Sequence, residues 1–345
     1  MYDFTVCGAG PVGSYLAWRL SERGQKVLLL EEHKKIGEPL ACSGLVSRNL
    51  KGFLPGNFFS GTEYIVEREI KGARLHTEKK TRTFKSDQAL VIDRLKLDKL
   101  MAKKAEKAGA ELVTGARLFS FFESKNKVSL YVKSAGFQNK RTKILAGCDG
   151  PLSVVRKNMG ISPPNLLHGI FCYTNEKPDS FVDLYFKKVP GFFAWRIPRR
   201  EGTEYGLACK KNAKKHFEKF SKKLKFSYKK VYSGLIPYGL LPRVTTRRTF
   251  LCGDAASQVK PHTGGGLLYG LTAADVASSL IRPDEPDMKS YEREWRNRLA
   301  FEIRCGLWVK RSYSMPSPLL NMALNSLYSK HEKRGLEMDR PSSMW

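Results

Sequence analysis

The run Phe4-Thr5-Val6-Cys7-Gly8-Ala9-Gly10-Pro11-Val12-Gly13 decides how this chain begins to fold. Its largely apolar start, up to Cys7, is typical of a buried parallel strand. Gly8, Gly10 and Gly13 then allow a tight turn, a close approach of the backbone to a pyrophosphate and close packing of the next helix. The N-terminal end of that helix attracts phosphate. The run therefore predicts a dinucleotide-binding β-α-β unit, although a lone motif of this kind is weak evidence.

The second strand of this unit, residues 26–31, ends at an acidic residue, Glu31. Its carboxylate can accept hydrogen bonds from an adenosine ribose, and it disfavours a 2′-phosphate, so FAD or NAD fits better than NADP. The competing interpretation is a glycine-rich turn that only joins a strand to a helix. The strand, the glycine spacing and Glu31 together count against it.

Two later motifs favour FAD. Asp149-Gly150 and Gly253-Asp254 each follow an apolar strand, and an aspartate at such a strand end can hydrogen-bond a hydroxyl of the flavin's ribityl chain. Gly264-Gly265-Gly266 lies at the start of a helix expected over residues 263–281, whose free N–H groups can stabilise negative charge on a reduced flavin. Three glycines also let the flavin ring lie against bare backbone. An aspartate helix cap and a glycine loop without a ligand are the alternative.

Size and composition indicate a two-domain α/β protein. The chain has 345 residues, enough for two cores, and contains no apolar run of the ~18–20 residues that span a bilayer. No basic segment precedes the first apolar run, so we expect no signal peptide and an intracellular protein. The seven cysteines are widely spaced and the six histidines show no ligand spacing, so we expect reduced thiols and no metal.

The net charge of +28 is concentrated in the lysine-rich segment 210–230. Phe217, Phe220, Leu224 and Phe226 interrupt the lysines at near-helical spacing. A solvated helix face is the default interpretation. An amphipathic surface on an anionic membrane is the second, with about 1 kcal/mol from each basic residue near the lipid. Nucleic acid is a less favoured partner because no nucleic-acid-reading motif is present.

The order of expected elements divides the chain into interleaved parts. Residues 1–60, 91–165 and 246–285 are predicted to form a discontinuous Rossmann-type FAD-binding domain, with a helix over residues 95–108. Residues 61–90, with several short strands, and 166–245 are predicted to form an inserted, mainly antiparallel β-sheet substrate domain. Residues 286–345 are predicted to be a helical C-terminal region, interrupted at Pro316 and Pro318.

With these motifs in place, residues 1–300 resemble the FAD-dependent geranylgeranyl reductase family, especially the archaeal digeranylgeranylglycerophospholipid reductases, within the p-hydroxybenzoate-hydroxylase-like flavoproteins. The run Gly37-Glu38-Pro39-Leu40-Ala41-Cys42-Ser43-Gly44-Leu45-Val46-Ser47 is similar to the family's P-x-x-C-x-G-L-V-S loop beside the flavin. The run Pro190-Gly191-Phe192-Phe193-Ala194-Trp195-Arg196-Ile197-Pro198 is similar to its P-x-x-Y-x-W-x-F-P motif in the prenyl pocket. Phe193 replaces the usual Tyr and Ile197 the usual Phe, which keeps the site apolar but removes a phenol.

The resemblance implies a reaction and a set of residues. Reduced FAD would give a hydride from its N5 to one carbon of an isolated alkene in a prenyl lipid, and a proton would reach the other carbon. Such an alkene offers no carbonyl to stabilise charge, so positioning and a dry pocket matter. Cys42 is the candidate that shapes or protonates this step, although a free cysteine is often only a small buried hydrophobe. The implied catalytic or pocket residues are Cys42, Phe193 and Trp195, and the implied cofactor-binding residues are Gly8, Gly10, Gly13, Glu31, Cys42, Arg94, Asp149, Gly150, Asp254, Gly264, Gly265 and Gly266, with His262 as a weaker candidate.

Several alternatives stay open. An FAD-dependent monooxygenase or halogenase uses the same scaffold, but Phe193 stands where a halogenase has the first Trp of W-x-W-x-I-P. A basic protein that keeps the FAD fold without turnover is a non-enzymatic alternative. No second nucleotide fold for NAD(P)H is visible, so a nicotinamide, a ferredoxin or another reduced carrier is a candidate electron donor. An isoprenoid lipid substrate and a peripheral position at the inner face of the membrane are expected.

Overall fold

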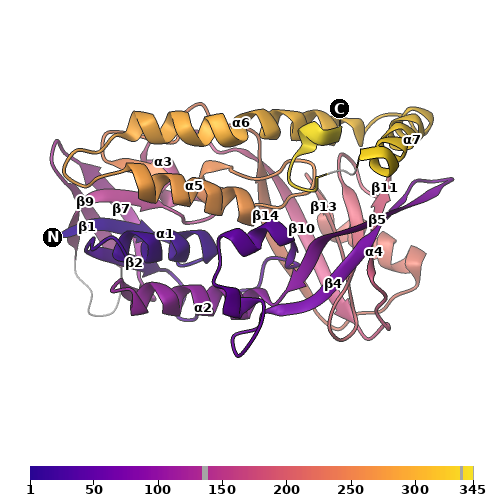
Figure 1. Cartoon of the computed structure of the whole chain (residues 1–345), viewed down its shortest axis with the longest axis horizontal. Helices are drawn as coiled ribbons and strands as arrows, with labels where there is room; N and C mark the ends of the chain where they lie inside the picture. The colour runs from indigo at the N-terminus through magenta and orange to yellow at the C-terminus, as the bar shows by residue number, and fades with distance from the viewer. Residues whose placement is uncertain (134–138, 335–336, 345) are drawn as a thin grey trace.

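The computed structural model describes residues 1–133, 139–334 and 337–344 of the chain, which build two β-sheets joined end to end and covered by helices. In Figure 1 the first sheet and its helices occupy the left half, the second sheet occupies the right half, and helix α6 runs along the top across both. This is the α/β architecture expected from the sequence.

The first sheet is centred on the glycine motif. Strand β1 (Tyr2–Cys7) pairs in parallel with β2 (Val27–Glu31) on one side and with β9 (Lys140–Gly147) on the other. The remaining strands of this sheet are β6 (Glu111–Thr114), β15 (Thr249–Leu251), β8 (Val128–Lys133) and β7 (Arg117–Glu123). The parallel strands β1, β9 and β15 bring three motif-bearing loops to one sheet edge, where open α/β sheets bind ligands.

Helices cover the first sheet. Helix α1 (Pro11–Ser21) packs between α2 (Arg94–Lys107) and α5 (Leu267–Leu280), while the short α3 (Val154–Asn158) packs against β7. Helix α5 begins four residues later than the sequence predicted, at Leu267 instead of Thr263. The glycine triplet folds back instead, because the Gly264 N–H donates to the Lys260 carbonyl at 2.8 Å and Gly264 has φ +77°.

The second sheet carries the apolar half of the molecule. Its strands, in spatial order, are β14 (Val231–Tyr238), β10 (Asn165–Thr174), β13 (Thr203–Cys209), β12 (Phe193–Pro198), β11 (Phe181–Phe186), β4 (Val66–His76), β5 (Thr81–Ile92) and β3 (Leu45–Ser47). The short strands expected near residues 64–85 form one long hairpin, β4–β5. Its register shifts interrupt the alternation of apolar and polar residues by which a long strand is recognised in a sequence. Residues 45–47 pair with β5, although the sequence assigned residues 1–60 to the FAD-binding part.

The lysine-rich segment forms α4 (Ala213–Leu224), and its aromatic stripe faces inward. Phe217 and Phe220 are buried, and Phe226 stacks on Tyr205 with ring centroids 4.1 Å apart. The second interpretation, an aromatic stripe that lies on a membrane, is therefore wrong, because the rings fill the core of the second half. The lysines of α4 form a solvated helix face.

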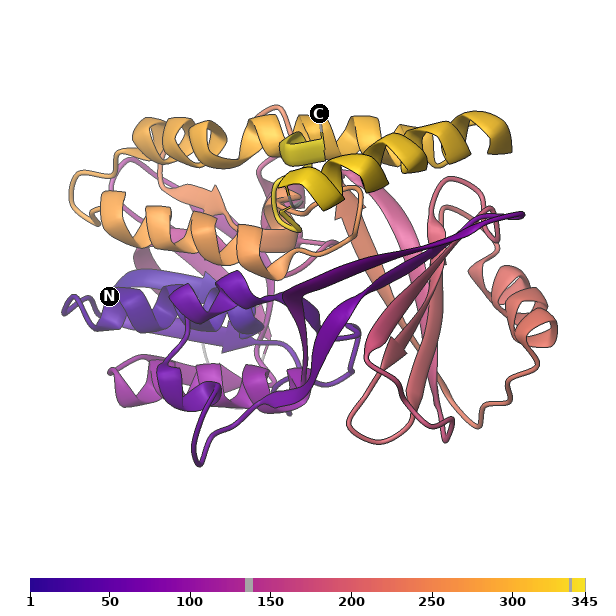
Figure 2. The ribbon, with the colours of Figure 1, turned by 45° about the vertical axis from the view of Figure 1, so that its right-hand side comes forward.

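The C-terminal region is helical, as expected, with α6 (Met288–Ser312), α7 (Ser317–Arg334) and a final turn, η4 (Pro341–Met344). The buried side chains of Tyr291 and Trp295 anchor α6 to the core of the first half. Figure 2 shows α7 beside the far end of the β4–β5 hairpin, where Arg82 donates to Asn325 at 2.8 Å. Within the described part of the chain, no helix combines the length and apolarity needed to cross a bilayer.

Candidate functional site

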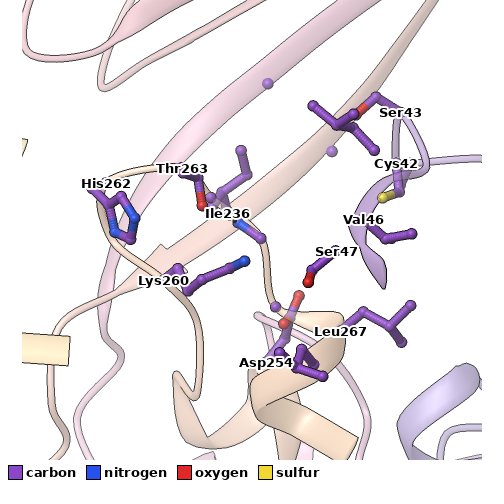
Figure 3. A pocket seen from close by; sticks show the side chains of 18 of the residues that line it. Cys42, Ser43, Val46, Ser47, Ile236, Asp254, Lys260, His262, Thr263 and Leu267 are labelled. Atoms are coloured by element: carbon purple, nitrogen blue, oxygen red, sulfur yellow. Dashed lines mark hydrogen bonds between the residues drawn. The ribbon is translucent and has the colours of Figure 1, made fainter. Parts of the chain in front are cut away.

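A single large cavity of about 1110 Å³ extends between the two halves of the molecule. It runs from the glycine turn after β1 to the inner side of α7, and both sheets contribute to its walls. Pockets for one small ligand usually measure ~300–1000 Å³, so this cavity has room for a cofactor and part of a second molecule. Figure 3 shows the region where the two halves meet.

The glycine turn is shaped by close backbone approaches. A Cβ on Gly13 would lie 1.9 Å from the Gly8 carbonyl oxygen, and one on Gly8, at φ +96°, would lie 2.4 Å from the Cys148 oxygen. A Cβ on Gly10 would meet nothing within 4 Å, and Gly10 lines the cavity. Gly10 also caps α1 with no side-chain acceptor on the first N–H groups. The turn thus leaves bare backbone and a helix N-terminus for a pyrophosphate.

Glu31 lies at the end of β2 with its carboxylate fixed from two directions. Its Oε2 accepts a hydrogen bond from the Ala9 N–H at 2.9 Å, and its Oε1 accepts one from the His33 N–H at 3.0 Å. The side chain borders the cavity beside the glycine turn. Oε1 also lies 2.7 Å from the His33 Nδ1, whereas Oε2 has no other hydrogen-bond partner among the described residues, so the carboxylate can accept a hydrogen bond from an adenosine ribose hydroxyl through Oε2.

The two motif aspartates differ in what they contact. Asp149 accepts hydrogen bonds from the Ser153 hydroxyl at 2.5 Å and the Val155 N–H at 3.0 Å, so its carboxylate is held at the N-terminus of α3, next to the N-cap residue Ser153. Asp254 has no such partner among the described residues, and a Cβ on Gly266 would lie 2.7 Å from its Oδ1. Burial raises the pKa of Asp254 to about 6, although Arg94 opposes this. A half-buried carboxylate at the cavity wall, without a partner among the described residues, fits the ribityl hydroxyls of FAD.

Cys42 lies in a loop at the junction of the two halves, on the opposite side of the pocket from His262 in Figure 3. The Gly44 N–H points at the Cys42 Sγ at 3.5 Å, and a Cβ on Gly234 of β14 would lie 2.6 Å from the Ala41 oxygen. The Arg199 guanidinium also donates to the Ser43 carbonyl. The loop is thus held against the second sheet, and Cys42 lines the cavity.

Arg94, at the start of α2, lies beside the Cys42 loop. It forms an ion pair with Asp98 one helical turn later at 3.2 Å, and it is close enough to interact with the Cys42 sulfur. Burial alone would lower the pKa of Arg94, but Asp98 and Cys42 raise it. The guanidinium is therefore a permanent positive charge facing the cavity next to Cys42 and Asp254.

A buried ion pair that sequence reasoning missed supports the glycine triplet. The Lys260 Nζ lies 2.7 Å from the Asp339 Oδ1, both side chains are almost fully buried, and Asn49 donates to the other Asp339 oxygen at 2.7 Å. Lys260 and Asp339 are far apart in the sequence, so no local pattern signals the pair. It ties the C-terminal segment to the loop that carries Gly264, Gly265 and Gly266, all of which line the cavity.

His262 is buried in the same loop, and neither ring nitrogen has a hydrogen-bond partner among the described residues. Burial, aided by Lys260, lowers the pKa of His262 to about 3, so its imidazole is neutral at physiological pH. His262 lines the cavity. The described residues include no group of three or more His, Cys, Asp or Glu side chains that could hold a metal ion.

The apolar half of the cavity is built on β12. Phe193 stacks on Phe192 with centroids 4.2 Å apart, and the Trp195 Nε1 donates to Glu204 at 2.8 Å. A Cβ on Gly206 would lie 2.4 Å from the Trp195 Cε2, so this glycine makes space for the indole. Further apolar walls come from several elements: Ile70, Leu75, Val182, Leu184, Phe186, Ile197, Leu320 and Leu324.

Comparisons with known proteins agree with this geometry. A family described as "FAD binding domain" matches residues 1–169. A digeranylgeranylglycerophospholipid reductase of Methanocaldococcus jannaschii is 28% identical over 86% of this chain and 83% of its own length. The same enzyme of Methanosarcina acetivorans is 27% identical over 91% of this chain and 85% of its own.

Solved structures show the same fold. A geranylgeranyl bacteriochlorophyll reductase-like protein from Thermoplasma acidophilum superposes with a TM-score of 0.86 at 21% identity, over 99% of this chain and 94% of its own. A probable FAD-dependent monooxygenase from Pseudomonas aeruginosa gives a TM-score of 0.73 at 15% identity, over 94% and 99%.

The cofactor is FAD, and the residues that would cradle it belong to a flavin-dependent oxidoreductase. Bare glycine backbone, the fixed Glu31 and the unpartnered Asp254 supply what a dinucleotide of this kind requires. The chain is thus similar in sequence to archaeal digeranylgeranylglycerophospholipid reductases and shares its fold with the Thermoplasma acidophilum protein.

Proposed function

We propose that this protein saturates double bonds of geranylgeranyl chains in membrane lipid precursors of the archaeal ether type. The observation that carries the proposal is the continuity of one cavity from Asp254 and the glycine triplet to the apolar walls around Phe193 and Trp195. A polar cofactor end and a long apolar end suit a flavin and a prenyl chain. The reductase relatives share most of the chain's length, which supports the same assignment.

FAD, when bound and reduced, supplies a hydride to one carbon of an isolated C=C bond, and the other carbon then needs a proton. Gly8, Gly10 and Glu31 are proposed to hold the adenosine diphosphate end. Asp254 is proposed to orient the ribityl chain. Phe193 and Trp195 are proposed to exclude water and to hold the alkene in the orientation that hydride transfer from the flavin requires.

Cys42 is proposed to give the proton from its Sγ to the second carbon. Cys42 lines the same cavity as the glycine triplet and Trp195, which supports this role. The thiolate that remains would be stabilised by the Arg94 guanidinium and the Gly44 N–H, and water would reprotonate it after product leaves. Arg94 is thus a positioning residue in this account.

The reducing equivalents are proposed to come from a nicotinamide, a ferredoxin or another reduced carrier. The protein is proposed to work in the cytoplasm, in peripheral contact with the inner face of an anionic membrane. The net charge of +28 is the property that supports this contact.

The test is anaerobic incubation of the dithionite-reduced protein with a digeranylgeranylglyceryl phospholipid, followed by mass spectrometry of the lipid. We expect the gain of two hydrogens for each double bond reduced, and a loss of at least about a hundredfold in rate for Cys42→Ala. Unchanged lipid after incubation with protein shown to carry FAD would contradict the proposal.

A second candidate is an FAD-dependent monooxygenase, because a probable monooxygenase shares this fold over most of both chains. That function requires reduction of the flavin by NAD(P)H and rapid consumption of oxygen. Oxygen uptake coupled to NAD(P)H oxidation, with a hydroxylated product, would favour it over the reductase.

A further inference from the structure

Large apolar side chains are exposed along the two C-terminal helices. Phe301 and Trp308 of α6 are 63% and 62% exposed, and their spacing of seven residues puts them on one side of the helix. This group, which we call the α6–α7 apolar edge, consists of Phe301, Trp308, Met315, Leu319 and Met322, each exposed. Figures 1 and 2 both place α6 and α7 along the same edge of the molecule. Several large apolar side chains exposed along one edge indicate a binding surface.

Basic residues alternate with the apolar ones on α6. Arg304 and Arg311 are exposed and fall between or beside Phe301 and Trp308 on the same side of the helix. The Arg311 guanidinium lies 4.9 Å from the centroid of the Trp308 ring. Aromatic rings flanked by arginines are typical of helices that lie in the headgroup region of an anionic bilayer.

The cavity reaches the same edge. Met315 is 42% exposed and also lines the cavity, and Ala323 and Ser326 of α7 are likewise both exposed and part of its wall. Leu320 and Leu324 lie inside this opening and are buried. An apolar path thus leads from the exposed edge, past α7, to the walls beside the flavin site.

We propose that the α6–α7 apolar edge docks on the surface of an anionic bilayer and that a prenyl chain enters the cavity beside α7, at the opening lined by Met315, Ala323 and Ser326. This inference rests on the proposed function, since it assigns the route by which that substrate arrives. It also changes which helix contacts the lipid. The rings of α4 are in the core, so α4 offers only solvated lysines, whereas α6 and α7 offer apolar side chains to insert.

The test is flotation of the full-length, FAD-loaded protein with vesicles of phosphatidylglycerol and phosphatidylcholine. The test variant combines Phe301→Gln with Trp308→Gln, and neither of these two residues lines the cavity. The matched control is Phe119→Gln with Phe122→Gln, because Phe119 and Phe122 are 50% and 65% exposed on β7, in the other half of the molecule. We expect the α6 variant to bind vesicles at least about tenfold more weakly and the β7 control to bind like the wild type.

A charge test uses the same vesicles. Arg304→Gln with Arg311→Gln is expected to weaken binding by about fivefold for each charge, which corresponds to about 1 kcal/mol per residue at the lipid surface. Lys219→Gln with Lys222→Gln on α4 removes two exposed charges away from this edge and is expected to have a smaller effect. Equal losses from both pairs, with no loss from the aromatic variant, would overturn the proposal in favour of diffuse charge attraction.

Intrinsic fluorescence gives an independent measurement. Among the tryptophans that the structure describes, Trp18, Trp195 and Trp295 are buried and Trp308 is exposed. Vesicles with brominated acyl chains should quench the wild type but not Trp308→Phe. Absence of quenching would overturn the membrane assignment. So would a wild-type dimer, formed without lipid, that the double substitution Phe301→Gln with Trp308→Gln dissociates.

Activity separates this inference from the function on which it rests. The α6 aromatic variant should reduce detergent-dispersed lipid at the wild-type rate and vesicle lipid at least about tenfold more slowly. Equal rates on both forms would refute the docking surface while leaving the reductase function intact. A wild type that reduces neither form would refute the function itself, and vesicle flotation would then still report on the surface.

Discussion

The two ends of the cavity are built on different principles. At the cofactor end, single atoms decide the geometry: a Cβ on Gly13 would lie 1.9 Å from the Gly8 oxygen, and Asp254 is held close to Gly266. At the apolar end, the walls come from strands and helices spread over the whole chain, and most of them only need to be apolar. The comparison shows that a polar cofactor requires particular residues at fixed positions. A prenyl chain requires only a cavity of sufficient volume from which water is excluded.

The largest effect is expected at Gly13. Gly13→Ala pushes a methyl group into the Gly8 carbonyl, so helix α1 must shift away from β1. We expect purified Gly13→Ala protein to retain no FAD and to melt well below the wild type. Flavin absorbance after gel filtration and thermal unfolding check both effects.

Gly10→Ala separates cofactor binding from folding, because a Cβ at this position would lie within 4 Å of no other protein atom. The FAD-free variant should melt like the FAD-free wild type, while its affinity for FAD should fall by at least about tenfold. Wild-type FAD affinity for Gly10→Ala would show that the pyrophosphate does not approach this turn.

The second prediction concerns Asp254, whose pKa burial raises to about 6 from an ordinary value of 3.8. Because the folded protein binds this proton more tightly than the unfolded chain, the FAD-free protein loses stability as the pH rises from about 4 through 6. The loss is at most roughly 3 kcal/mol. Asp254→Asn should remove this part of the pH dependence and stabilise the FAD-free protein at neutral pH.

The same substitution should weaken FAD binding by about tenfold to a hundredfold, since a charged hydrogen-bond acceptor for the ribityl chain is lost. Urea unfolding of FAD-free wild type and Asp254→Asn between about pH 4 and 8 measures the first effect, and flavin titration the second. A variant that is less stable at neutral pH and binds FAD normally would mean that Asp254 serves the fold.

The sequence was informative about positions where the chemistry of a ligand restricts the residue type. It was uninformative about contacts that only the packing of the folded chain determines. Gly8, Glu31 and Asp254, which all line the cavity, could be singled out because each lies at or shortly after the end of a strand. Asp149 has the same local pattern, yet its carboxylate is occupied by the Ser153 hydroxyl and the Val155 N–H at the start of α3, which only the folded chain reveals.

Distant contacts were beyond the sequence. The Lys260–Asp339 pair joins segments that no local pattern connects. The aromatic spacing of α4 fits a membrane face and a core face equally well, because helical periodicity shows that one side is apolar but not what covers it. The exposed rings of α6 could be separated from its buried ones only in the folded chain.

The third prediction tests the apolar end. Gly206→Val would displace the Trp195 indole, since even a Cβ there lies 2.4 Å from the ring. Its hydrogen bond to Glu204 would also be lost. We expect FAD to stay bound and KM for the prenyl lipid to rise by about tenfold, as an apolar wall moves into the cavity. Loss of FAD together with substrate binding would show that the two ends are not independent.

The smallest effect is expected for Phe193→Tyr, which introduces the residue usual in the reductase family that the chain resembles. Phe193 is packed against Phe192 and Tyr313, so an added hydroxyl costs about 1 kcal/mol of folding free energy unless it finds a partner. We expect a reduction rate within about threefold of the wild type, because a single buried hydroxyl without a partner changes little at this site. Steady-state assays of lipid reduction are the measurement. A gain of more than tenfold would assign the phenol a role in protonation.

The central claim is that one cavity brings the flavin and an isolated prenyl double bond together. Anaerobic stopped-flow mixing of the reduced protein with the prenyl lipid tests it directly, with flavin absorbance and lipid mass recorded on the same sample. We expect reoxidation of one flavin for every double bond saturated, in the absence of oxygen. A flavin that stays reduced with the lipid, and is oxidised only when oxygen is admitted, would contradict it.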